Sequence, residues 1–336
     1  MTPQHLLYLQ SKIADALKGL IPEAPFALLD FPDYDNIGDS AIYVGELELF
    51  KRHGLRPTYQ SKVDAIDWLQ MDEAIGDGPI FLHGGGNFGD IWPWFQPFRE
   101  EVLERYRGRK VVQLPQTIHY TSQARIDQTA RIIEKHGAFV LLVRDQPSYD
   151  LATRYFQCEV RFCPDMAFAM GRLQRASPAN ELLLHLRLDQ EAAGRHDESK
   201  YLGRPGVISS DWPPETPELR RRVMQRTKLR HKIRRVITLS KGSELAFREM
   251  QYQALAETRL NRGIALLSSG RAVITDRLHG HILCSLLGIP HCVLDNSYGK
   301  TSAFISAWET SGDGVYQADS LDEAVETLRA QERLSV

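Results

Sequence analysis

The densest group of potentially reactive side chains lies in residues 274–281, ITDRLHGH, at the end of an apolar run. Arg277 can donate two parallel hydrogen bonds to a carboxylate or phosphate, and His279 can exchange a proton near neutral pH. A helix starting here would add backbone N–H groups that favour an anion. The segment therefore predicts a site for a small phosphorylated acid. In the alternative interpretation, Asp276 caps the helix, Arg277 pairs with it, and the histidines pack or face water.

A glycine run in the first third of the chain is a second candidate binding element. Residues 84–86 follow an apolar run, so a ligand can approach their backbone closely, but the lysine and hydroxyl of a nucleoside-triphosphate loop are absent. Asn87 can hydrogen-bond a sugar. The aromatic side chains of Trp92, Trp94 and Phe95 can stack on a sugar or pack in the core.

Asp39, which follows Gly38 at the start of a predicted helix, is a candidate base or hydroxyl anchor. Its alternative role is to stabilise the helix N-terminus by about 0.3–1 kcal/mol. His279 and His281 are two residues apart, and no two histidines have the i, i+4 spacing of a helical zinc site. We therefore expect neither a metal nor a resident cofactor.

The elements that must position these groups alternate between short apolar runs and helical sequence. The runs end at polar, proline or glycine positions; they cover residues 24–30, 79–83, 110–114, 139–143, 181–186, 271–276 and 290–295. The glycines at 84–86 and the segment 113–120 are expected to be loops. Buried runs alternating with helices predict parallel sheets covered on both faces.

Chain length and a pause in the pattern near residues 172–180 predict an α/β protein with two Rossmann-like parallel-sheet domains facing a central cleft. We expect an N-terminal domain over residues 1–175, a C-terminal domain over 176–318 with a basic insertion at 205–245, and a closing helix at 319–336. Residues 1–20 are predicted to form an amphipathic helix.

A formal net charge of −2 gives no overall electrostatic attraction to nucleic acid. The four cysteines contain no CxxC pair, which favours a reducing compartment. We expect a cytoplasmic protein, because no stretch approaches the roughly 20 apolar residues of a membrane span. Residues 219–241 contain no acid but many arginines and lysines interleaved with apolar side chains. This segment predicts either contact with the inner face of the cytoplasmic membrane, or a solvated helix or partner interface.

Five segments in order along the chain resemble the motifs of the polysaccharide pyruvyltransferase family. ITDRLHGH, followed by LLGIP and DNSYGK, resembles the C-terminal signature. Residues 36–42, NIGDSAI, resemble the N-terminal motif, GGGN at 84–87 the glycine loop, and RDQPS at 144–148 the arginine motif. Pro164 and Asp165 also fit. Residues 113–120 and the basic segment are the least similar, which leaves the identity of the acceptor open.

The resemblance implies a fold similar to the two-domain (GT-B-like) glycosyltransferases, phosphoenolpyruvate as co-substrate, and a pyruvate ketal on a saccharide. A lipid-diphosphate-linked saccharide is one candidate acceptor. It implies His279 as general acid and Asp39 as candidate base. The implied donor-binding residues are Arg277, Arg144, Leu278 and Lys300, and the implied acceptor-binding residues are Asn36, Gly85, Gly86 and Asn87. Two alternatives stay open: a sugar-nucleotide glycosyltransferase of the same architecture, and a non-catalytic glycan-binding protein.

Overall fold

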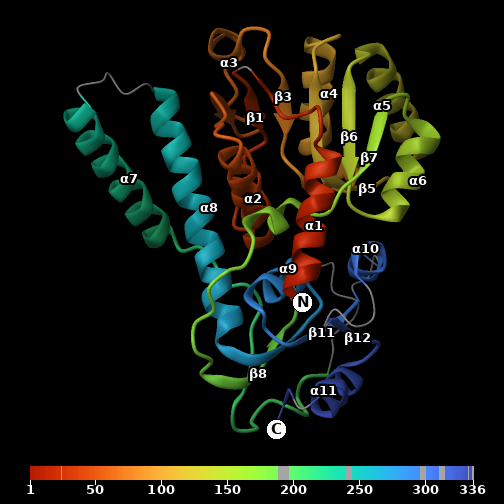
Figure 1. The fold of residues 1–336 in the computed structure, drawn as a ribbon, viewed down its shortest axis with the longest axis vertical. Helices are drawn as coiled ribbons and strands as arrows, with labels where there is room; N and C mark the ends of the chain where they lie inside the picture. The colour runs from red at the N-terminus through yellow and green to blue at the C-terminus, as the bar shows by residue number, and fades with distance from the viewer. Residues whose placement is uncertain are drawn as a thin grey trace.

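The computed structural model describes residues 1–23, 25–187, 197–238, 244–295, 300–309, 315–331 and 333–334, without the side chains of 234–238 and 300. Two parallel sheets lie in two lobes, one above the other in Figure 1. The predicted α/β class with two Rossmann-like sheets is confirmed. Ala24 and residues 296–299, which belonged to a predicted strand and to the DNSYGK motif, lie outside the described residues.

The first sheet has seven strands in the order β2-β1-β3-β5-β6-β7, and β4 also pairs with β5. All pairs are parallel. Its strands are β1 (Ala27–Leu29), β2 (Tyr59–Ser61), β3 (Ile80–Leu82), β4 (Gly85–Gly89), β5 (Val111–His119), β6 (Phe139–Val143) and β7 (Glu159–Phe162). The helices of this half are α1 (Pro3–Ala16), α2 (Ile37–Arg52), α3 (Trp68–Ile75), α4 (Phe95–Arg105), α5 (Gln123–His136) and α6 (Gln146–Tyr155), followed by the 3₁₀ helix η1 (Met166–Met170).

The second sheet has five parallel strands in the order β12-β11-β10-β8-β9. Its strands are β8 (Asn180–His185), β9 (Val207–Ser209), β10 (Gly270–Thr275), β11 (His291–Leu294) and β12 (Val315–Ala318). The helices here are α7 (Pro217–Thr238), α8 (Glu244–Ser268), α9 (Leu278–Leu287), α10 (Lys300–Trp308) and α11 (Leu321–Ala330). α11 lies within the predicted closing helix at 319–336, and its N-cap is Ser320, whose side chain accepts from the N–H of Glu323.

Two segments that were expected to be loops contribute to strands instead: the glycine run at 84–86 and the proline-bearing segment at 113–120. The glycine run enters β4, and β5 continues through Pro115 to His119. Pro115 lacks an N–H, but it lies where β3 gives way to β4 as a partner and where the β5–β6 register shifts between Gln113 and Gln116. The prediction of a loop at 113–120 was therefore wrong.

One apolar cluster is shared by the two sheets. It contains Leu28 and Val112 from the first sheet, Leu183 and Val273 from the second, and the buried face of α1, as the leucine spacing predicted. Helices α2, α8 and α9 contribute side chains to the same cluster and contact one another. The two lobes are thus joined by a common core, which fixes the relative positions of their strand ends.

Each sheet reverses its strand order beside its first strand. In the first sheet, β1 lies between β2 and β3, and in the second, β8 lies between β9 and β10. Loops after such neighbouring strands diverge to opposite faces and leave a crevice at the carboxyl ends. The loops after β1, β3, β8 and β10 are therefore expected to line a binding site. Within the described residues, no helix is both long and apolar enough to cross a bilayer.

Candidate active site

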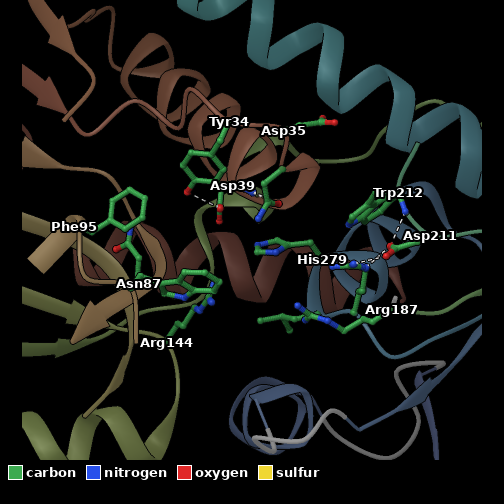
Figure 2. Close-up of a pocket in the computed structure, with 15 residues that line it drawn as sticks. Tyr34, Asp35, Asp39, Asn87, Phe95, Arg144, Arg187, Asp211, Trp212 and His279 are labelled. Atoms are coloured by element: carbon green, nitrogen blue, oxygen red, sulfur yellow. Dashed lines mark hydrogen bonds and ion pairs between the residues drawn. The ribbon is translucent and has the colours of Figure 1, made fainter. Parts of the chain in front are cut away.

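A cavity of about 530 Å³ lies between the two lobes, lined by the loops at these reversal points. Figure 2 shows its side chains converging from both halves of the chain, with the ring of His279 among them. The lining residues are Tyr34, Asp35, Asn36, Asp39, Gly86, Asn87, Trp92, Phe95, Arg144, Arg187, Asp211, Trp212, Arg277, Leu278 and His279. The chain therefore brings together eight of the ten predicted site residues; Gly85 is not among the lining residues, and the side chain of Lys300 lies outside the described residues.

The start of α9 faces this cavity. Its cap residue is Arg277, without a side-chain cap hydrogen bond, and Leu278 and His279 form the first turn. Asp276 does not cap the helix, because its carboxylate accepts from the backbone N–H of Arg187 at 2.9 and 3.2 Å. That part of the alternative interpretation is wrong, and the helix start retains its positive end for an anion.

Arg277 is held by a carboxylate that the sequence analysis did not single out. Its Nε and Nη2 donate to Oδ1 and Oδ2 of Asp211, both at 2.6 Å. Asp211 follows β9 and lies 66 residues before Arg277, so no local motif links the two. A bidentate pair of this kind fixes the plane of the guanidinium as well as its position.

His279 lies between the two lobes. A Cβ placed on Gly38 of α2 would lie only 2.3 Å from His279 Nδ1, so the imidazole packs directly on that glycine. On its other side, Nε2 is 3.4 Å from Oδ2 of Asp165, and the side chain keeps 14% of its surface exposed. The imidazole is thus positioned by both lobes but remains accessible from the cavity.

Asp165 links His279 to Arg144. Its Oδ2 also pairs with Arg144 Nη1, while Arg144 Nε donates to Thr117 Oγ1 at 3.0 Å. Burial opposes ionisation of Asp165, but His279, Arg144 and the N–H of Ala167 hold its pKa below the usual value. The carboxylate therefore stays charged and holds the side chains of His279 and Arg144 at the cavity wall.

The opposite wall comes from the N-terminal half of the chain. Asn36 caps α2, its Oδ1 accepting from the N–H groups of Gly38 and Asp39 at 2.8 and 3.3 Å. Tyr34 donates its hydroxyl to Asp39 Oδ2 at 2.8 Å, as the dashed line in Figure 2 marks. Asp39 thus lies in the first turn of α2 and faces the cavity. This position leaves both interpretations made from the sequence open.

Asn87 is held rigidly by a buried polar network behind the cavity. Its Oδ1 accepts from Arg99 Nη2 at 2.9 Å and from Gln116 Nε2 at 3.0 Å, and its Nδ2 lies 3.4 Å from Asp30 Oδ2. Asp30 has a φ of 70°, unusual for a residue other than glycine. Burial raises the pKa of Asp30 to about 7 despite the nearby His83 and Arg99.

The remaining predicted residues differ in their placement. Gly85 is absent from the cavity lining and has a φ of 133°, which favours glycine. Lys300 begins α10, and its side chain lies outside the described residues. Trp92 and Phe95 line the cavity, whereas Trp94 is 76% exposed and does not.

His281 faces away from the cavity. Its Nδ1 lies 2.8 Å from His291 Nε2, and its Nε2 lies 2.8 Å from Glu309 Oε1; all three side chains are buried. These contacts join α9 to β11 and to the end of α10. The two histidines of the HGH motif therefore have different structural roles, one at the cavity and one in the core.

Comparison with known proteins places this fold and site in a family. A family model described as "Polysaccharide pyruvyl transferase" matches residues 36–298. The chain is 30% identical to the "Putative pyruvyl transferase EpsO" of Bacillus subtilis (strain 168), with 90% of this chain and 91% of that protein covered. It is 31% identical to "Pyruvyl transferase 1" of Schizosaccharomyces pombe (strain 972 / ATCC 24843), covering 90% and 75%. An uncharacterized Klebsiella pneumoniae protein of known crystal structure shares the fold, with a TM-score of 0.54, 19% identity and coverage of 89% and 93%.

Proposed function

This chain belongs to the polysaccharide pyruvyl transferase family, and from that premise we propose that it transfers the pyruvyl group of phosphoenolpyruvate to a sugar of a surface glycan or exopolysaccharide repeat unit. The product is a cyclic pyruvate ketal that bridges two hydroxyls. The observation that carries the proposal is the position of His279, in the cavity between an arginine-bearing wall and an acid-bearing wall.

The donor half of the cavity suits a small dianionic acid. Arg144 and Arg277 come from different lobes, and each is oriented by its own aspartate, Asp165 or Asp211. Together with the open N-terminus of α9 they offer directional N–H groups to a carboxylate and a phosphate. In this role Leu278 contributes its backbone N–H in the first turn of α9, and Lys300 contacts the leaving phosphate.

His279 is proposed as the general acid that protonates the methylene carbon of phosphoenolpyruvate. The adjacent carbon gains positive character and is attacked by the first sugar hydroxyl. The bond from that carbon to the ester oxygen breaks, and phosphate leaves. The second hydroxyl then closes the ketal. The proton of the first hydroxyl passes through Asp39 to the departing phosphate, and the proton of the second hydroxyl restores His279. A positioned acid of this kind contributes about 10²- to 10⁴-fold in rate.

The acceptor half of the cavity is proposed to bind the sugar. Asp39, held by Tyr34, takes the proton of the attacking hydroxyl, and Asn87 and the backbone of Gly86 hydrogen-bond the ring. Phe95 and Trp92 provide aromatic faces against which a sugar can stack. In this proposal Asn36 acts through α2, because its side chain caps the helix that carries Asp39.

The test is to incubate the purified chain with phosphoenolpyruvate and oligosaccharides that carry neighbouring free hydroxyls. We expect phosphate release together with a mass gain of one pyruvate less one water, and neither with His279→Ala at unchanged thermal stability. The sugar-nucleotide alternative predicts instead that a nucleotide sugar is consumed and that phosphoenolpyruvate neither binds nor reacts. That second result would overturn the proposal and the roles given to Arg277 and His279.

A further inference from the structure

Helix α7 projects from the body of the protein, with α8 as its neighbour (Figure 1). One side of α7 is internal: Val223 and Met224 pack on the core, and Thr227 is buried. The ring of His231 lies 5.0 Å from that of Phe247 on α8. These contacts account for the inner side of α7 and leave its opposite side facing solvent.

The outer side of α7 combines positive charge with exposed apolar side chains. Leu229 is 59% exposed and Ile233, one turn further on, is 50% exposed. The side chains around them at helical spacing are exposed as well. We call this surface the basic face; it consists of Arg221, Arg222, Gln225, Arg226, Leu229, Lys232 and Ile233. The whole chain has a formal net charge of −2, so this positive charge is a local concentration.

The N-terminal end of α7 is fixed to the cavity rim. Arg220 Nη2 bonds to Asp33 at 2.7 Å, and its Nη1 lies 3.2 Å from Glu215. The backbone N–H of Glu215 donates in turn to Asp35, which lines the cavity. Arg220 is therefore engaged within the protein and does not belong to the basic face. A surface bound by α7 would lie at a defined orientation to the cavity.

We infer that the basic face binds an anionic lipid surface. Two apolar side chains one turn apart can enter the interface between head groups and acyl chains while the surrounding arginines and lysines contact lipid phosphates. A second copy of the chain is a poor occupant, because symmetric pairing would bring like charges together. Since α7 is anchored at the rim, binding holds the cavity beside the membrane, where a lipid-linked saccharide would be presented.

The test measures co-sedimentation with vesicles of phosphatidylcholine, with and without phosphatidylglycerol, in the absence of substrate. We expect wild-type protein to bind only the anionic vesicles, and added salt to weaken binding. Replacing Arg222, Arg226 and Lys232 by glutamine should weaken vesicle binding on the order of 100-fold, at about fivefold per basic residue. The matched control replaces three exposed bases outside α7, namely Arg131 and Lys135 of α5 and Arg107 just after α4, and should bind like wild type.

A second pair of variants tests the apolar part of the surface. Leu229→Gln with Ile233→Gln should lose about tenfold in vesicle affinity, whereas Leu7→Gln with Leu69→Gln, which are even more exposed but lie outside α7, should lose none. The inference is overturned if wild-type protein does not bind anionic vesicles, or if the α7 variants and their control variants lose the same amount of vesicle affinity. It also fails if the α7 variants instead change the oligomeric state. None of these outcomes depends on the proposed reaction, because no donor or acceptor is present.

Discussion

Replacing Gly38 by alanine should lower activity about 100-fold without unfolding the protein. The added Cβ would lie 2.3 Å from His279 Nδ1, whereas ordinary contacts begin at 3.4 Å. The imidazole must therefore move by about 1 Å, and a displacement of that size can cost about 10²-fold in rate. Alanine in a helix is otherwise favourable over glycine by up to about 1 kcal/mol, so thermal stability should change little.

The assay for Gly38→Ala is the initial rate of phosphate release from phosphoenolpyruvate with acceptor, alongside a thermal melt. Gly45→Ala on the same helix is the matched comparison. There the Cβ would lie 2.0 Å from the backbone oxygen of Met166, so stability rather than His279 geometry should suffer. A Gly38→Ala enzyme with wild-type activity would refute the argument that contact with α2 positions His279.

Three further predictions concern other parts of the site. Asp211→Asn should raise the KM for phosphoenolpyruvate about tenfold with less effect on kcat, because Arg277 loses its bidentate, charge-assisted pair of hydrogen bonds. Steady-state kinetics at saturating acceptor measures both constants. Tyr34→Phe should raise the acceptor KM and leave the donor KM unchanged in the same assay. Burial lowers the pKa of His83, but Glu46 and other acids raise it to about 9. Protonated His83 therefore stabilises the fold fully below about pH 6.5 and loses this effect as pH rises through 9. Glu46→Gln should flatten this decline in thermal melts.

The sequence predicted the fold class because buried parallel strands leave a strong local pattern. Runs such as 139–143 and 271–276 are apolar on both faces and end at polar residues, and the structure has strands at both. The short strands β2, β7, β9 and β12 have no such runs and were missed. β4 was missed because glycine has low strand propensity, and here pairing with β5 decides the conformation.

The sequence also predicted most of the cavity lining, because the reactive residues follow strand ends. It did not single out Asp211, and it named Asp165 only as a motif residue without linking it to Arg144 or His279. Asp211 is 66 residues from Arg277, and Asp165 is 21 from Arg144, so only the folded chain pairs them. Asp30 was predicted to end a strand. Its positive φ and the burial that raises its pKa depend on the folded chain, which the sequence pattern does not reveal.

The central claim is that the acceptor receives a pyruvyl group formed by protonation of phosphoenolpyruvate at its methylene carbon. The most direct measurement is the reaction in D₂O, followed by NMR and mass spectrometry of the glycan product. If His279 exchanges its proton with solvent and delivers it, the new methyl group should carry one deuterium. A product without a pyruvate-derived methyl group, or with a methyl group free of deuterium, would contradict the account.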